Sequence, residues 1–154
     1  WRNMYGPLNG RVRDHELVTR IIALYMNWKS YSKPLKNFLN DFYQDYSGNS
    51  IKDLAKAFEI FKKAADLLDA TEGKSALRSG RQLNIAWSDA IFVALMTKLQ
   101  DGVDISLSEL KAIIDSLREN EEFLHFITGP TSDDIFVENR ITIALESFGI
   151  YVNE

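Results

Sequence analysis

Three carboxylates are placed where acid-base chemistry could be performed. Asp14 and Glu16 lie near the start of one strongly apolar segment, and Asp89 lies inside another, residues 85–95. Such a carboxylate can act as a general acid or base, because burial and nearby charges shift its pKa. Each also has a structural explanation: Asp14 as a helix cap, Glu16 in an i,i+4 pair with Arg20, and Asp89 in a buried ion pair.

Asp89 needs a partner, because an ionised carboxylate taken out of water alone costs several kcal/mol. The partner must be a cation or a hydrogen-bond donor. Arg20 is the best candidate, since it lies on the narrow polar strip of the other strongly apolar segment, residues 11–29. The sequence therefore predicts that Arg20 and Asp89 meet inside the fold, with a structural role.

The sequence contains few residues that could bind a metal or act as a nucleophile. There is no cysteine, and the two histidines, His15 and His125, lie far apart in the sequence. His125, in the segment Phe-Leu-His-Phe, is interpreted as a helix residue rather than a ligand. The common glycine-rich phosphate loops and the Gly-x-Ser-x-Gly elbow are absent. We therefore predict no catalytic residue, no metal and no cofactor in this chain.

Basic charge is concentrated in the first part of the chain. Residues 1–100 hold 15 Lys and Arg against 10 Asp and Glu, whereas residues 101–154 hold 3 against 12. A polyanion would be attracted to the first part and repelled by the second, although solvated helix faces and helix-end capping explain the same charges. The arginines that we expect to contact nucleic acid or another domain are Arg11, Arg13, Arg78 and Arg81.

Hydrophobic periodicity predicts an all-α fold, with residues 1–154 forming a single helical domain. We expect a compact bundle of about six or seven helices and an irregular lead-in over residues 1–10. The segments 11–29 and 82–99 are apolar around most of the helix and should form two largely buried central helices. The other predicted helices cover residues 34–46, 50–71, 106–117, 121–127 and 131–148.

Several helix ends carry recognisable signals. Ser32 and Pro34 are placed to open the second helix, Ser106 and Glu109 form a capping box, and Gly149 is placed to end the last helix. No apolar run is long enough to cross a bilayer, and the absence of cysteine fits a cytoplasmic protein. Because the sequence begins with Trp1 rather than methionine, we expect the chain to be a fragment of a larger protein.

Three blocks of sequence stand in a fixed order along the chain. The first is Arg11-x-x-Asp14-x-Glu16-Leu17-Val18-x-Arg20-x-x-Ala23-Leu24-Tyr25, continued by Tyr31-x-Lys33-Pro34-Leu35-x-x-Phe38-Leu39-Asn40. The second is Leu83-Asn84-x-Ala86-Trp87-x-Asp89-Ala90-Ile91-x-Val93-Ala94-Leu95. The third runs from Thr131-Ser132 through Val137-x-x-Arg140-Ile141. Together they resemble the GmrSD-type restriction endonuclease family, in the helical part that follows the ParB-like core of its N-terminal (DUF-type) domain.

This resemblance implies a bacterial phage-defence protein that acts on modified phage DNA. The ParB-like core of that family binds and hydrolyses nucleotide and is often joined to an HNH-type nuclease domain. This chain lacks the Asp-Gly-Gln-Gln-Arg motif of the core, having only Asp101-Gly102-Val103, and it lacks a His-Asn-His constellation. We therefore expect a non-catalytic helical subdomain that supports a missing core, with that core, a nuclease domain and DNA as partners.

Two alternatives remain open from the sequence. The first is a protein-interaction module whose acidic half, from Asp101 onward, docks a basic partner or mimics DNA. Its mark would be a gathering of acidic side chains on one face rather than their dispersal. The side chains concerned are Asp104, Asp115, Glu119, Glu121, Glu122, Asp133 and Asp134. The second alternative, a free-standing enzyme, has the least support, since the longer protein rather than this chain would be the nucleotide-dependent nuclease.

Overall fold

The computed structural model describes Met4 and residues 13–46, 51–100 and 102–152. Seven α-helices and no strand are present in this part of the chain, which confirms the predicted all-α bundle. None of these helices is both long enough and apolar enough to cross a membrane. The helices are α2 (Arg13–Asn27), α3 (Leu35–Tyr46), α4 (Ile51–Glu72), α5 (Ile85–Gln100), α6 (Leu107–Glu119), α7 (Glu121–Phe126) and α8 (Asp134–Ser147).

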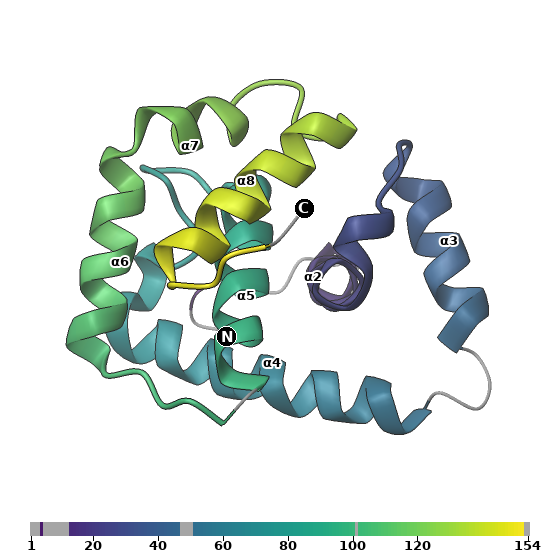
Figure 1. Ribbon diagram of the computed structural model, residues 1–154, viewed down its shortest axis with the longest axis horizontal. Coiled ribbons are helices and arrows are strands. Elements are labelled where there is room, and N and C mark those ends of the chain that lie inside the picture. Colours follow the sequence, from purple (N-terminus) through teal and green to yellow (C-terminus); the bar gives the residue numbers. More distant parts are fainter. Residues whose placement is uncertain (1–3, 5–12, 47–50, 101, 153–154) are drawn as a thin grey trace.

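Helix α5 is the centre of the bundle, as the sequence predicted for this segment. Every residue from Ala86 to Met96 is buried, and α8, α2 and α4 pack around it (Figure 1). Enclosure on all sides is possible because the run is apolar apart from Ser88 and Asp89. The hydroxyl of Ser88 donates to the carbonyl of Asn84 at 2.8 Å, so only Asp89 needs a partner from another helix.

Helix α2, the other segment predicted to form a largely buried central helix, is buried along one face and is less enclosed than α5. Leu17 and residues 21–24 are buried against the core, whereas Tyr25, Met26 and Trp28 are half-buried. Tyrosine and tryptophan often sit this way, with the apolar ring covered and the polar end wet. Composition indicates that these side chains are apolar, but it does not indicate whether another helix covers them.

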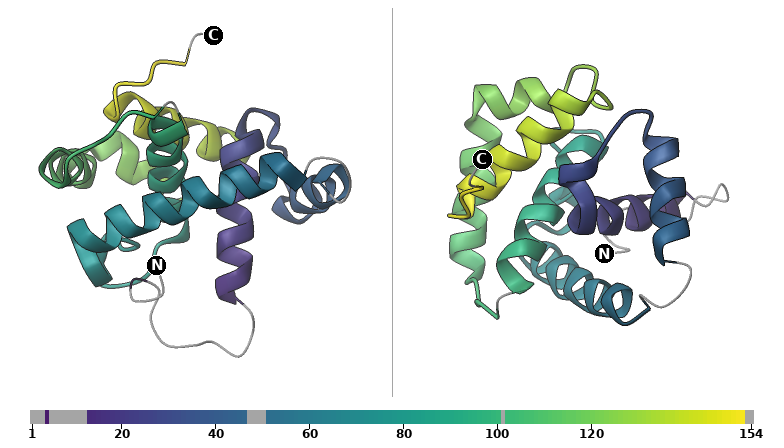
Figure 2. Two further views of the ribbon diagram at one scale, coloured as in Figure 1. Left: turned by 90° about the horizontal axis from the view of Figure 1, so that it is seen from below. Right: turned by 45° about the vertical axis from the view of Figure 1, so that its right-hand side comes forward.

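Helix α3 stands beside the N-terminal end of α4, which crosses both α5 and α2 (Figure 2). Phe38 and Phe42 of α3 are buried, while Tyr43 is 58% exposed. An apolar groove of about 540 Å³ opens between α2, α3 and α4, and the exposed ring of Phe58 lines it. On its other side, α4 meets α5 through the stacked rings of Phe61 and Phe92, whose centroids lie 5.0 Å apart.

The predicted helix signals hold in two places and fail in one. The Ser106 hydroxyl accepts the backbone N–H of Glu109 at 3.2 Å, and Gly149 follows α8 with a φ of +75°, a conformation that favours glycine. The entry to α3 differs, because the helix begins at Leu35, after Pro34. The segment before α3 is held by α8 instead, since the backbone N–H of Lys33 donates to Asp134 at 2.7 Å.

The connector between α4 and α5 is short of regular structure but firmly tied down. It contains a 3₁₀ turn at Gly73–Ser75 and a single bridge between Arg78 and Leu83. The indole N–H of Trp87 donates to the carbonyl of Ala76 at 2.9 Å, which anchors the connector on α5. Residues 1–10 lie outside the described part except for Met4, which is buried.

Candidate functional site

The predicted contact between Arg20 and Asp89 is present. The Nε of Arg20 donates to both carboxylate oxygens of Asp89, at 3.0 and 2.9 Å, and its Nη2 donates to Oδ2 at 2.6 Å. The Asp89 side chain is completely buried, and that of Arg20 is 15% exposed. The Nε and Nη2 of Arg20 thus bind the Asp89 carboxylate side-on, and this contact joins α2 to α5.

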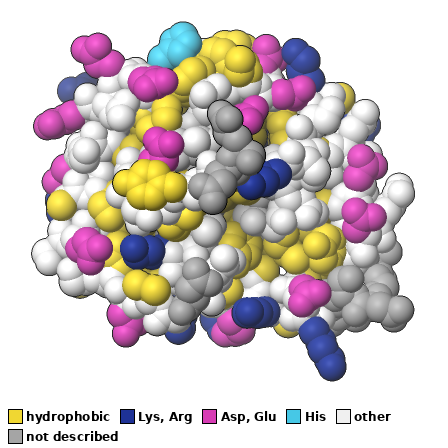
Figure 3. Space-filling view, viewed as in Figure 1, with side chains coloured by type: hydrophobic (Ala, Val, Ile, Leu, Met, Phe, Trp, Pro, Cys, Tyr) yellow, Lys and Arg dark blue, Asp and Glu magenta, His cyan; other side chains and the backbone are white. Residues whose placement is uncertain are grey.

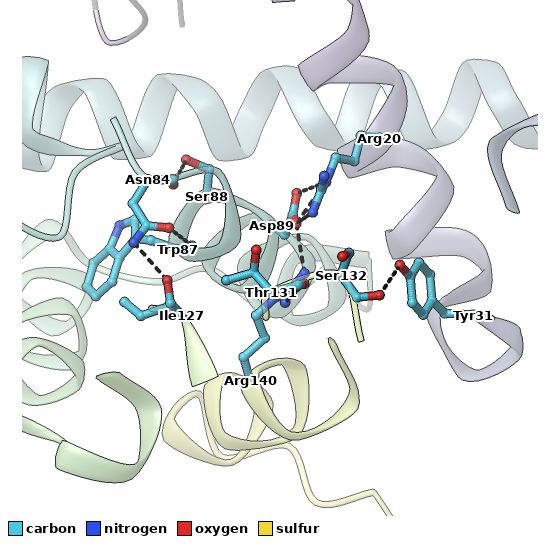
Figure 4. Close-up of polar contacts among 10 residues, drawn as sticks. All are labelled: Arg20, Tyr31, Asn84, Trp87, Ser88, Asp89, Ile127, Thr131, Ser132 and Arg140. Atoms are coloured by element: carbon cyan, nitrogen blue, oxygen red, sulfur yellow. Dashed lines mark hydrogen bonds and ion pairs between the residues drawn. The ribbon is translucent and has the colours of Figure 1, made fainter. Parts of the chain in front are cut away.

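A second arginine, Arg140 of α8, reaches the same carboxylate and was not anticipated from the sequence. Its Nη2 donates to Asp89 Oδ2 at 3.1 Å, and its Nη1 donates to the backbone carbonyl of Thr131 at 2.5 Å (Figure 4). The Arg140 side chain is 0% exposed, and its Nε has no hydrogen-bond partner among the described residues. Asp89 therefore joins α2, α5 and α8 at one buried point.

The network of Arg20, Asp89 and Arg140, here called the buried triad, carries two positive charges against one negative. Burial alone would lower the pKa of Arg20, but the charge and hydrogen bonds of Asp89 outweigh it and raise that pKa. The pKa of Arg140 is lowered by burial, and the neighbouring charge of Arg20 adds to this effect while Asp89 opposes it. Both guanidinium groups remain charged at neutral pH.

Tyr31 lies beside the buried triad. Its hydroxyl donates to the carbonyl of Ser132 at 2.8 Å, which ties the segment after α2 to the start of α8 (Figure 4). Burial raises the pKa of Tyr31, with Arg20 and Arg140 acting in the opposite direction. At neutral pH the phenol therefore stays protonated and serves as a hydrogen-bond donor.

The geometry assigns the triad to structure rather than to acid-base catalysis. Asp89 is inaccessible and already accepts hydrogen bonds on both oxygens, so it can neither reach a ligand nor exchange a proton with one. Its arginines are turned inward to it. What the triad can do is fix the relative positions of three helices.

The two other carboxylates singled out in the sequence play no part in the triad. Glu16 is exposed, and within the described part of the chain it forms no ion pair with Arg20, whose guanidinium turns to Asp89 instead. The predicted i,i+4 pair was therefore wrong, because the buried partner binds Arg20 better than a solvated one. Asp14 lies in α2, but its side chain is outside the described residues, so the capping role stays a prediction.

A second polar network, centred on Asn84, was also missed. The Asn84 Oδ1 accepts the backbone N–H of Trp87 at 2.9 Å, which caps α5 and explains why the helix begins at Ile85. Its Nδ2 donates to the carbonyl of Ile127 at 3.1 Å and to the Ser79 hydroxyl at 3.0 Å. One amide thus joins α5, the connector and the end of α7 (Figure 4).

The candidate basic residues are only partly available for a polyanion. Arg78 folds back on its own loop, where its Nε donates to the carbonyl of Lys74 at 2.9 Å and its Nη1 to that of Arg81 at 3.3 Å. Arg81 itself is exposed. Arg11 lies outside the described residues, and Arg13 lies in α2 with a side chain that is not described. Of the four, the structure therefore describes the side chains of Arg78 and Arg81 alone, which lie on the same connector.

Acidic side chains of the second half are dispersed and partly neutralised. Asp115 contacts Lys111 and Arg118, and Asp133 pairs with Lys33 at 3.2 Å. The face shown in Figure 3 mixes both signs of charge rather than presenting one. Of the seven predicted residues, Asp134 lines a cleft, at the start of α8.

A metal site is absent from the described part, where no three His, Asp or Glu side chains converge. His125 lies in α7, as predicted, and its ring packs against Phe126 and Phe136 at centroid distances of 5.0 and 5.3 Å. The comparisons with known proteins add no assignment: no family model matches the chain, and neither a curated protein nor a solved structure is significantly similar to it. The function must therefore be argued from the residues themselves.

Proposed function

We propose that this chain is a non-catalytic helical domain of a GmrSD-like restriction protein, in which it supports a ParB-like nucleotide-hydrolysing core. One observation carries the proposal: each of the three sequence blocks that resemble this family supplies one member of the buried triad. Arg20 comes from the first block, Asp89 from the second and Arg140 from the third. The presence of Arg20, Asp89 and Arg140 in the blocks is thus explained by holding three helices together.

Further contacts between the blocks support the same interpretation. Tyr31 of the first block donates to Ser132 of the third, and Asn84 of the second block caps the helix that carries Asp89. Residues of this kind indicate a structural role, because the polar groups that form these contacts are already hydrogen-bonded within the fold and do not face a substrate. The catalytic groups of the proposed protein would lie in its other domains, and it would act in the cytoplasm.

The test compares this chain with the full product of the gene that encodes it. Nucleotide hydrolysis and restriction of phage carrying modified DNA are measured for both. We expect no hydrolysis by the chain alone, and hydrolysis by a longer product that carries the ParB-like Asp-Gly-Gln-Gln-Arg motif. Hydrolysis by the chain alone, or a longer product without that motif, would contradict the proposal.

Contact with DNA is a separate part of this proposal and rests on Arg81 and Lys74, which are both exposed on the connector before α5. Binding of labelled duplex DNA is measured as a function of salt concentration. The variant Arg81→Ala should weaken binding and lower the salt slope by about one, whereas Lys63→Ala, an exposed change on α4, should not. Absence of binding at low salt would leave the supporting role alone.

A further inference from the structure

A cleft of about 500 Å³ lies between α8 and the 3₁₀ turn η1 (Trp28–Ser30) that follows α2. These two elements lie side by side, with α8 facing the end of α2 (Figure 1). One wall is aromatic, formed by the half-buried rings of Trp28 and Tyr31. The other wall is the outer face of α8. The three residues of the buried triad do not line this cleft, although Tyr31 borders both.

Four residues of α8 that line the cleft follow one another at four-residue spacing: Asp134, Glu138, Thr142 and Glu146. They share one helix face and are spaced by about 6 Å along the axis. Glu138 and Glu146 are exposed and form no ion pair within the described part of the chain. Like charges four residues apart, such as Asp134 and Glu138, weaken a helix. Asp134 already accepts the backbone N–H of Lys33 at 2.7 Å, so Glu138 and Glu146 are the carboxylates of this row for which the described residues supply no ion-pair partner.

The aromatic wall already holds a cation. The Nζ of Lys29 lies 5.8 Å from the centroid of the Trp28 ring, and Lys29 is the one basic residue among the described lining of the cleft. Its side chain is exposed, so it can swing aside at little cost. An indole face that accepts one ammonium will accept another, and its apolar edge suits the methylene stem of lysine or arginine.

We propose that this cleft binds an extended, basic segment of a partner protein, with lysine or arginine at alternate positions. Charge complementarity argues for this occupant, since Glu138 and Glu146 line the cleft without an ion-pair partner in the described part of the chain, and Lys29 is the one basic residue of its described lining. The length of the row argues for it too, because alternate side chains of an extended chain are about 6.7 Å apart and nearly match the carboxylates of α8. A single small cation would contact only one or two neighbouring residues of this row.

The test uses a fluorescein-labelled peptide, Lys-Gly-Lys-Gly-Ser-Gly-Lys, titrated with the 154-residue chain and followed by anisotropy at low salt. A second peptide of the same composition, Lys-Lys-Lys-Gly-Ser-Gly-Gly, keeps the charge but loses the spacing. We expect the first peptide to bind more tightly than the second. Equal binding of both peptides would overturn the proposal, because general charge attraction would then suffice.

Two variants locate the binding. The double change Glu138→Gln with Glu146→Gln should weaken binding of the spaced peptide about tenfold, since it removes two ion pairs. The matched control, Glu121→Gln with Glu122→Gln, makes the same charge change on exposed residues of α7 and should leave binding unchanged. An equal loss in both variants would place the peptide outside the cleft and overturn the proposal.

A third variant works in the opposite direction. Lys29→Ala removes the cation that competes for the Trp28 ring, so the spaced peptide should bind more tightly than to the unchanged chain. Unchanged or weaker binding would contradict a site on this wall. Spermine and Mg²⁺ are titrated alongside, and binding of either without binding of the spaced peptide would replace the proposed partner with a small cation. Circular dichroism melts establish that all variants are folded.

Discussion

Arg20 and Arg140 reach the same buried carboxylate from two different helices, one before and one after the helix that carries it. Both donate to Oδ2 of Asp89, at 2.6 and 3.1 Å. Two guanidinium groups against one carboxylate leave a surplus positive charge inside the fold, which the backbone carbonyl of Thr131 helps to offset.

Asp89→Ala should lower the free energy of unfolding by about 3–5 kcal/mol, because it leaves two buried arginines without a counter-charge. Chemical denaturation with two probes measures this change. Asp66→Ala is the matched control, since Asp66 is exposed on α4 and its loss should change stability by less than about 0.5 kcal/mol. If Asp89→Ala unfolds at the same denaturant concentration as the unchanged chain, the triad contributes no stability.

Replacing one arginine should cost less than replacing Asp89, because a neutral one-to-one pair remains. We expect Arg20→Met and Arg140→Met each to cost about 1–3 kcal/mol, with Arg140→Met the more costly. Arg140 is fully buried and also serves the Thr131 carbonyl, whereas Arg20 keeps some contact with water. Equilibrium denaturation ranks the variants by their free energy of unfolding. An arginine variant that loses as much of this free energy as Asp89→Ala would contradict an arrangement of two guanidinium groups around one carboxylate.

The raised pKa of Tyr31 predicts a loss of stability at alkaline pH. A phenol whose pKa is higher in the folded state contributes stability that is fully present below the unfolded-state pKa of about 10 and is lost as pH rises through the folded-state value. Tyr31→Phe should be less stable at pH 7, since it loses the hydrogen bond to Ser132. Its deficit should narrow above about pH 10, and a constant deficit across pH 8–11 would contradict the shift.

Asn84→Ala should cost about 2–3 kcal/mol, because it removes the cap of α5 and leaves the buried carbonyl of Ile127 without its donor. Thermal melting followed by circular dichroism measures the loss. Asn40→Ala provides the control, since Asn40 is exposed on α3 and alanine is the better helix former there. A melting temperature for Asn84→Ala equal to that of the control would remove the bridging role of this amide.

The sequence was sufficient for the helices and for two of the three members of the triad, Arg20 and Asp89. Apolar periodicity located every described helix, and the cost of burying a charge led from Asp89 to Arg20. Arg140 was missed although it lies three residues after Val137 and four before Ala144, on the inner face of α8. The signal that could have identified Arg140 was its helical spacing from apolar residues that face the core.

Other features depended on information that a linear pattern does not carry. The difference in enclosure between α2 and α5 was not predicted, because the number of helices around a segment is set by the whole packing and not by its own composition. The bridging role of Asn84 depends on Ile127, a distant residue that meets it only in the folded chain. The membership of the GmrSD-type family stays a prediction, with the chemistry of the blocks as its support.

The order of the triad residues along the chain, with Arg140 after Arg20 and Asp89, has a consequence for synthesis. A ribosome that has released α2 through α5 exposes a neutral pair, Arg20 with Asp89, whose charges cancel before any later helix exists. The second guanidinium can join only after α8 has emerged, and it brings with it the carbonyl of Thr131 that it needs. The nascent protein can thus pair its carboxylate early, and the carboxylate becomes fully enclosed, together with the extra charge, when α8 packs on α5.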